Sequence, residues 1–108
     1  MTLTEVVNDT SLLHCKCGID MIIREQVIQD DQGRIVRYKL TFIHYLLCRT
    51  DNGRVLGYEN VRGYHHRHFM GSVECVEFIS YEALLSRFLA EVKALRRNHE
   101  QGCRGHGF

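Results

Sequence analysis

The most restrictive feature of the chain is a stretch of alternating apolar and polar residues that lies between two turn signals. Apolar side chains take alternate positions, at Val36, Tyr38, Leu40 and Phe42. Polar side chains take the positions between them, at Arg37, Lys39 and Thr41. Because successive side chains of a β-strand point to opposite faces, this pattern predicts a half-buried antiparallel strand, which we place over residues 34–48.

Turn signals on both sides of this strand predict a β-meander. Asp30-Asp31-Gln32-Gly33 precedes the strand, and Asp51-Asn52-Gly53 follows it. Asp accepts local backbone hydrogen bonds, Gly adopts positive φ, and Asn-Gly suits a type I′ hairpin turn. We therefore expect neighbouring strands over residues 19–29 and 54–60, a loop over 61–72, and a short fourth strand over 73–79.

A helix is predicted over residues 81–97, with Ser80 as its N-cap. Its apolar positions recur at helical spacing and form one stripe, at Leu84, Leu85, Phe88, Leu89, Val92 and Leu95. The stripe should pack on the sheet, so that Phe88 or Leu89 contacts Leu40 or Phe42. The expected fold class is α+β, with an antiparallel meander of about four strands and one long C-terminal helix packed on one face.

Length and composition predict one globular domain. The chain has 108 residues, of which 44% are hydrophobic and 25% are charged, and this usage is ordinary for a folded protein. We expect an N-terminal arm or edge strand at residues 1–18, a single α+β domain at 19–97 and a polar tail at 98–108. No apolar run approaches the roughly 20 residues that span a bilayer, and no signal-peptide pattern is present. We therefore expect a cytoplasmic protein without a membrane role.

The cysteines predict free thiols. Their number is odd, and they lie at Cys15, Cys17, Cys48, Cys75 and Cys103, which points to a reducing compartment. We expect Cys48 and Cys75 to be buried or half-buried. Zinc ligands also occur near both ends of the chain, at His14, Cys15, Cys17, His99, Cys103 and His106. Their spacings do not match a zinc finger, so a structural zinc at the two ends is the less favoured alternative. We predict no metal site and no cofactor.

The run Arg62-Gly63-Tyr64-His65-His66-Arg67-His68 carries the strongest signal for chemistry. It lies in the basic part of the chain, since residues 34–73 contain seven Lys or Arg against two acids, although the formal net charge is only +1. Imidazole exchanges protons near neutral pH, and arginine binds phosphate with a planar set of donors. These groups can cleave an RNA backbone without a metal. A solvated turn with no chemistry is the alternative interpretation.

Strand alternation would place His66 and His68 on one side of this run and His65 and Arg67 on the other. We therefore expect His66 and His68 to act as base and acid, with His65 as a further catalytic candidate. Arg67 would contact the phosphate, and Glu59 would orient a histidine. The predicted substrate-binding residues are Arg62, Tyr64, Arg37 and Lys39. A Cys75–His pair is a less favoured alternative.

The chain resembles the TumE family of small bacterial toxins from type II toxin–antitoxin modules. The resemblance rests on Gly57-Tyr58-Glu59-Asn60, on Gly63-Tyr64-His65-His66-Arg67-His68, on Gly71, and on the strand and helix that follow. It covers roughly residues 19–97. The chain departs from the family at Glu59, where Asp is more frequent. The resemblance implies a growth-inhibiting toxin that is neutralised by an antitoxin, usually one with a helix-turn-helix domain.

We therefore expect the toxin component of a type II module, in the form of a small metal-independent endoribonuclease without a cofactor. Its partners would be RNA and a helix-turn-helix antitoxin, and whether it forms a homodimer is left open. One alternative is a non-catalytic module that binds RNA or a protein through the same basic histidine run. A second is a metal-dependent enzyme or sensor that uses the histidines with Glu59. A third is a toxin that transfers a group from a nucleotide cosubstrate.

Overall fold

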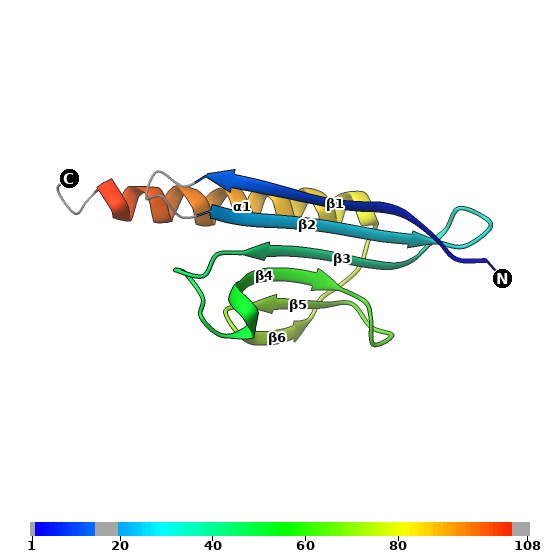
Figure 1. Ribbon diagram of the computed structural model, residues 1–108. Coiled ribbons are helices and arrows are strands. Elements are labelled where there is room, and N and C mark those ends of the chain that lie inside the picture. The colour runs from blue at the N-terminus through cyan, green and yellow to red at the C-terminus, as the bar shows by residue number, and fades with distance from the viewer. Residues whose placement is uncertain (1, 15–19, 105–108) are drawn as a thin grey trace.

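The computed structural model describes residues 2–14 and 20–104, and it contains one antiparallel sheet and one long helix (Figure 1). The sheet has six strands in sequence order: β1 (Thr4–His14), β2 (Asp20–Gln29), β3 (Ile35–Ile43), β4 (Arg54–Glu59), β5 (His66–Phe69) and β6 (Ser72–Cys75). The remaining elements are a short turn of 3-10 helix, η1 (Asp51–Gly53), and the helix α1 (Tyr81–Arg104). The predicted α+β meander with a C-terminal helix is confirmed, but the sheet has six strands where about four were expected.

The two additional strands lie at places where the sequence pattern is weak. β1 pairs with β2 along its length, in the segment that was predicted as an arm or edge strand. β5 lies inside the predicted loop at residues 61–72, because a strand of four residues that reads His-Arg-His-Phe has no apolar alternation to detect. Two predicted strands are shorter than expected, since β3 ends at Ile43 and β6 ends at Cys75. α1 continues past residue 97 to Arg104.

The turn before β4 has the expected chirality but not the expected position. Asp51 and Asn52 both have positive φ, at 52° and 55°, as the two central residues of a type I′ turn require. Gly53 closes the turn by donating from its backbone N–H to the Thr50 carbonyl at 3.0 Å. Residues 44–50 separate this turn from β3, so it does not join the two strands as a tight hairpin.

The helix packs against one face of the sheet, mainly over β3 and β4. Phe88 is fully buried in one core cluster with Leu40 and Phe42, as predicted. Leu89 is 48% exposed, so its predicted place in the buried stripe is wrong. The Ser80 side chain caps the helix by accepting from the Ala83 N–H at 3.1 Å, which confirms the predicted N-cap.

The register of the strands sorts side chains between the helix-covered face and the opposite face, which we call the open face. One row across the helix-covered face runs Glu25, Leu40, Tyr58, Arg67 and Glu74. The neighbouring row on the open face runs Gln26, Lys39, Glu59, His66 and Cys75. A second open-face row runs Arg24, Thr41, Gly57, His68 and Val73. The open face therefore collects most of the residues singled out for chemistry.

Candidate functional site

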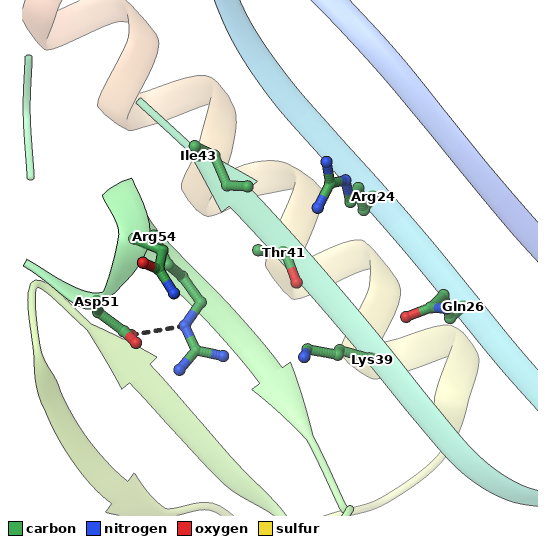
Figure 2. Close-up of a pocket in the computed structure, with 8 residues that line it drawn as sticks. Arg24, Gln26, Lys39, Thr41, Ile43, Asp51 and Arg54 are labelled. Carbon is green, nitrogen blue, oxygen red and sulfur yellow. Dashed lines mark hydrogen bonds and ion pairs between the residues drawn. The ribbon is translucent and has the colours of Figure 1, made fainter. Parts of the chain in front are cut away.

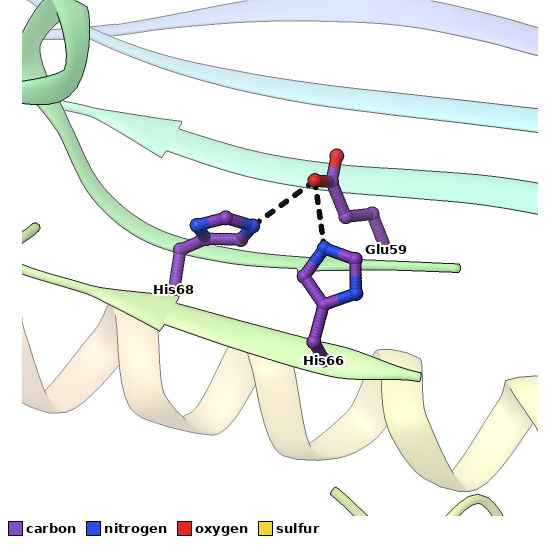
Figure 3. Close-up of side chains that lie close together, drawn as sticks. All are labelled: Glu59, His66 and His68. Carbon is purple, nitrogen blue, oxygen red and sulfur yellow. Dashed lines mark hydrogen bonds and ion pairs between the residues drawn. The ribbon is translucent and has the colours of Figure 1, made fainter. Parts of the chain in front are cut away.

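Three side chains from two adjacent strands meet on the open face and form what we call the His–Glu cluster: Glu59, His66 and His68 (Figure 3). Glu59 ends β4, and the two histidines stand two positions apart on β5, so strand alternation points them the same way. The Nε2 atoms of His66 and His68 lie 2.9 and 3.0 Å from the same oxygen, Oε1 of Glu59. The structure thus brings together three of the predicted catalytic residues.

His66 is surrounded by hydrogen-bond acceptors. Its Nε2 faces the Glu59 carboxylate, and its Nδ1 lies 3.1 Å from the backbone carbonyl of Tyr64. A carboxylate and a carbonyl only accept, so both contacts are hydrogen bonds only when each ring nitrogen of His66 carries a proton. The side chain is 3% exposed, and the Tyr64 ring lies against it with the ring centroids 4.8 Å apart. His66 is therefore enclosed, with an acceptor at each ring nitrogen.

His68 lies between a donor and an acceptor. The Nη2 atom of Arg54 is 3.0 Å from Nδ1 of His68. A guanidinium only donates, so Nδ1 accepts this bond, and Nε2 carries the proton that is donated to Glu59. Burial and then the positive charge of Arg54 lower the pKa of His68, and the hydrogen bond to Glu59 opposes them only in part. The site therefore favours the neutral form of His68.

The Glu59 carboxylate has cationic groups beside its second oxygen as well. Oε2 lies 3.9 Å from Nζ of Lys39 and 3.9 Å from Nη1 of Arg54. Burial alone would raise the pKa of Glu59, but the hydrogen bonds from His66 and His68 and the charge of Lys39 outweigh burial and lower it. Glu59 is therefore an ionised acceptor at neutral pH.

The same three side chains are also a candidate metal site, because their ligand atoms all lie within 4.8 Å of one another. Two histidines and a carboxylate are a donor set that binds divalent transition metals. A metal on Nε2 of His68 would require the ring proton on Nδ1, which is the atom that accepts the hydrogen bond from Arg54. Lys39 and Arg54 would also repel a cation. The arrangement therefore favours proton exchange over metal binding.

His65 lies on the other side of β5 from the His–Glu cluster, as alternation predicts. Its Nδ1 is 2.7 Å from the hydroxyl of Tyr38, and its ring stacks on Phe78 with the centroids 4.1 Å apart. Burial and then the charge of His66 lower the pKa of His65. The residue next to His66 is thus fixed among aromatic rings, away from the open face.

Arg67 joins the sheet to the helix. Its Nε donates to Glu91 of α1 and to the Tyr58 hydroxyl, each at 3.1 Å, and its Nη1 donates to Glu74 at 3.2 Å. Burial, followed by the hydrogen bond to Glu91, raises the pKa of Tyr58 to about 12. Arg67 therefore lies on the helix-covered face and points away from the His–Glu cluster.

The four predicted substrate-binding residues lie on β3 and on the turn between β4 and β5. The Lys39 side chain is 46% exposed beside Glu59. Arg37 precedes Lys39 by two positions on β3. Arg62 and Tyr64 belong to the turn between β4 and β5, and both are exposed, Tyr64 at 43%. A phosphate near Glu59 would therefore have Lys39 on one side and an exposed aromatic ring on the other.

A groove of about 240 Å³ lies on the open face next to the cluster (Figure 2). Its polar lining includes Arg24, Gln26, Lys39, Thr41 and Arg54. Of these, only Lys39 was predicted from the sequence as a binding residue. The others were missed because β2 reads mainly as an apolar strand, and because the meaning of Arg24 depends on which residues of β3 it faces.

Two residues near the cluster position it, although the sequence did not assign them that role. A Cβ atom at Gly57 would lie 2.9 Å from Cδ of Arg54, so the absence of a side chain lets Arg54 cross the sheet to His68. Asn60 makes hydrogen bonds through its side-chain amide to two backbone groups of β3, at 3.0 and 3.2 Å. These bonds tie the turn that follows Glu59 to the neighbouring strand.

The cysteines give a mixed outcome. Cys48 is buried as predicted, but Cys75 is exposed because it lies on the edge strand β6, so that expectation was wrong. Both are free thiols. Cys15, Cys17 and the side chains of His99, Cys103 and His106 lie outside the described residues. Within the described part of the chain, no helix is long and apolar enough to cross a membrane.

The comparisons with known proteins give one match. The family model described as Toxin TumE matches residues 5–96, a span that includes the His–Glu cluster, the groove and most of α1. No curated protein and no solved structure matches the chain. Because the family model covers most of the 108 residues, the chain belongs to the TumE family of toxins.

Proposed function

We propose that this toxin is a metal-independent endoribonuclease whose reaction centre is the His–Glu cluster. The proposal rests on the contrast between two histidines that share one carboxylate oxygen. Arg54 donates to Nδ1 of His68, whereas both ring nitrogens of His66 face acceptors. A neutral imidazole can accept a proton and an imidazolium can donate one, so the pair supplies a base and an acid for cleavage of a phosphodiester.

His68 is the base in this proposal. In the free protein its Nδ1 lone pair is occupied by Arg54. A substrate phosphate offers the guanidinium a charged, bidentate partner. Movement of Arg54 to that phosphate frees Nδ1 to take the proton of the 2′-hydroxyl. Glu59, which is bonded to Nε2, then stabilises the imidazolium that forms.

His66 is the acid. The Tyr64 ring lies against it in the free protein. Aromatic side chains bind unpaired bases by stacking, and an RNA base that stacks on the exposed Tyr64 ring would draw this ring away from His66. The leaving oxygen can then approach His66 and take the Nε2 proton, which in the free protein is donated to Glu59.

The reaction balances without a co-reactant. The 2′-oxygen forms a bond to phosphorus, and the bond from phosphorus to the 5′-oxygen breaks. His68 takes the 2′ proton, and His66 gives a proton to the 5′-oxygen, while Arg54 and Lys39 neutralise the charge on the phosphorane. The products carry a 2′,3′-cyclic phosphate and a 5′-hydroxyl. Transfer of one proton from His68 to His66 restores the starting state.

The test is an incubation of the purified chain with an unstructured RNA, with and without EDTA. We expect cleavage in both cases, cyclic phosphate ends, and no cleavage when the nucleotide at the cut site is 2′-deoxy. A shift of RNA in a gel without turnover would replace the proposal with a non-catalytic RNA-binding module. Loss of activity in EDTA that zinc restores would turn the cluster into a metal site.

A toxin that cleaves RNA must be inhibited in the cytoplasm, because its substrate is made there. We propose that a helix-turn-helix antitoxin inhibits this toxin by covering the open face. An acidic segment of the antitoxin would be attracted by exposed cationic side chains, which are Arg37, Lys39 and Arg62. Cross-linking from these positions should reach the antitoxin. Cross-links confined to the outer surface of α1 would contradict occlusion of the reaction centre.

A further inference from the structure

The groove on the open face shares two residues with the reaction centre and then continues away from it. Lys39 and Arg54 line the groove and also face Glu59. Arg24 on β2 lines its far side (Figure 2). Three strand spacings of about 4.8 Å separate β2 from β5, so the backbone of Arg24 lies roughly 14 Å from that of His68, which stands in the same row across the sheet. A group bound at Arg24 is therefore not the group that reacts at His66.

The groove carries an excess of positive charge. Its one acidic lining residue, Asp51, is paired with Nε of Arg54 at 2.7 Å. Arg24 makes no ion pair with any other described residue, and it is exposed. Gln26 and Thr41 add uncharged hydrogen-bonding groups between the cationic side chains. The lining thus suits a chain of phosphates and hydroxyl groups.

We propose that this groove binds the phosphodiester backbone of single-stranded RNA, with Arg24 holding a phosphate at least one nucleotide away from the one that is cleaved. The inference rests on the proposed function, because it states that the RNA bound at the His–Glu cluster continues across the sheet toward β2. Lys39 and Arg54 contact the phosphate at the reaction centre, Gln26 and Thr41 contact the intervening sugar, and Arg24 contacts the next phosphate.

The two ends of this path favour a single strand over a duplex. At one end the exposed Tyr64 ring offers a stacking surface, which requires an unpaired base. At the other end the groove offers charged groups that read only the backbone, so it does not require a particular base. A flexible single strand can meet both requirements at once, whereas the bases of a duplex remain stacked on each other.

The test compares Arg24→Gln with Arg97→Gln, which removes the same charge from an exposed position on α1, outside the groove. Binding is measured by fluorescence anisotropy with an RNA of about twelve nucleotides that is 2′-O-methylated throughout and so cannot be cleaved. We expect Arg24→Gln to weaken binding roughly 5–10-fold and to lower the slope of log K against log salt by about 0.7, the value for one lost phosphate contact on a single strand. Arg97→Gln should change neither quantity.

Cleavage of substrates of two lengths gives a second readout. A dinucleotide has one phosphodiester and therefore no phosphate to place at Arg24. We expect Arg24→Gln to raise KM for the long RNA with kcat unchanged, and to leave cleavage of the dinucleotide unaffected. Equal losses on both substrates would overturn the proposal, because Arg24 would then act at the reaction centre.

The binding readout separates this inference from the proposed activity. Salt-dependent binding that Arg24→Gln weakens, in a protein that never cleaves RNA, would support the groove and refute the endoribonuclease. Equal affinities of Arg24→Gln and Arg97→Gln for the single strand would overturn the groove. Equal affinity of the wild-type protein for a duplex of the same sequence would overturn the single-strand preference. Weaker binding of the antitoxin with unchanged RNA affinity would assign the groove to a protein partner.

Discussion

The two sides of strand β5 carry neighbouring residues with opposite tasks. His66 and His68 point to the open face and meet at the Glu59 carboxylate. Arg67, which lies between them in sequence, points the other way and is bonded to Glu91 of α1. A run of similar residues is thus divided by strand alternation into the proposed reaction centre and a structural connection. The comparison shows that position on a strand, more than residue type, decides what each member of such a run can do.

The same contrast extends across the whole sheet. On the helix-covered face the carboxylates are engaged by groups of the protein itself, since Glu91 accepts from Tyr58 and Arg67, and Glu25 accepts from Tyr81 at 2.5 Å. On the open face two arginines, Arg24 and Arg37, have no such partner among the described residues. Charges that serve the fold are satisfied internally, whereas charges that remain free are available to a ligand.

The largest expected effect of this division is on the reaction. His68→Ala and His66→Ala should each slow RNA cleavage by roughly 10²–10⁴-fold, the usual size of a lost general base or acid. The rate of the wild-type protein should follow a bell-shaped pH profile, with its acidic limb below the ordinary histidine value of 6.5, because the pKa of His68 is lowered. Quenched-flow or gel assays of initial rate across pH measure both quantities.

A matched substitution on the opposite side of β5 provides the control for this prediction. Arg67→Met should leave the cleavage rate of the folded protein within a few-fold of the wild type. A variant that lacks both His66 and His68 and keeps full toxicity in cells would overturn the proposed chemistry.

The second effect concerns the core beneath the helix. Phe88→Ala should lower the free energy of unfolding by roughly 3–5 kcal/mol, because a fully buried aromatic ring is removed and a cavity remains. Leu89→Ala, one position later on the exposed side of α1, should cost less than about 1 kcal/mol. Urea denaturation measures both. Equal losses for the two variants would mean that α1 is not docked on the sheet in this orientation.

The fold was predictable where one residue pattern dominated. The alternation around Tyr38, Leu40 and Phe42 and the apolar stripe through Phe88 gave the layers and the buried face. The number of strands was not predictable, because the polar strand β5 has no apolar period and forms only through pairing with β4 and β6. Strand ends at Ile43 and Cys75 also depend on those partners, which local sequence does not specify.

For the candidate site, the sequence predicted which residues lie on the same side of strand β5. Spacing alone places His66 with His68 and separates them from His65 and Arg67. The roles of Arg54 and Gly57 could not be inferred, because they follow from a register in which the Arg54 side chain crosses the sheet above a glycine. Arg24 belongs to the same class, since only the pairing of β2 with β3 brings it to the groove.

The third effect tests the connection on the helix-covered face. Arg67→Met should lower the free energy of unfolding by about 1–3 kcal/mol, because the partly buried Glu91 carboxylate then keeps only the more exposed Arg87 as a cationic partner. Addition of Glu91→Gln to this variant should recover part of the loss, since the carboxylate that has lost its nearer partner is then neutral. If the double variant loses more unfolding free energy than the two single variants lose together, a direct coupling between these residues is contradicted.

The smallest expected effect concerns a property that the two faces share, which is a histidine with a lowered pKa. The pKa of His65 on the helix-covered side and that of His68 on the open side are both lowered from the ordinary value of 6.5, in each case first by burial. Below pH 6.5 the unfolded chain therefore binds more protons at these two residues than the folded chain does. Their contribution to stability is complete above this pH and is lost as the pH falls through the lowered folded-state values.

Each histidine should add less than about 1.4 kcal/mol per pH unit to the slope of the unfolding free energy, which is the limit for one proton. His65→Gln and His68→Gln, measured by urea denaturation between pH 7.5 and 5.5, should each flatten that slope, because glutamine does not titrate. The window lies above the lowered pKa of Glu59, so the loss of this carboxylate does not dominate the result. A slope that steepens in His68→Gln would mean that the folded state binds the proton more readily there. Arg54 would then not hold His68 neutral, and the assignment of His68 as the base would fail with it.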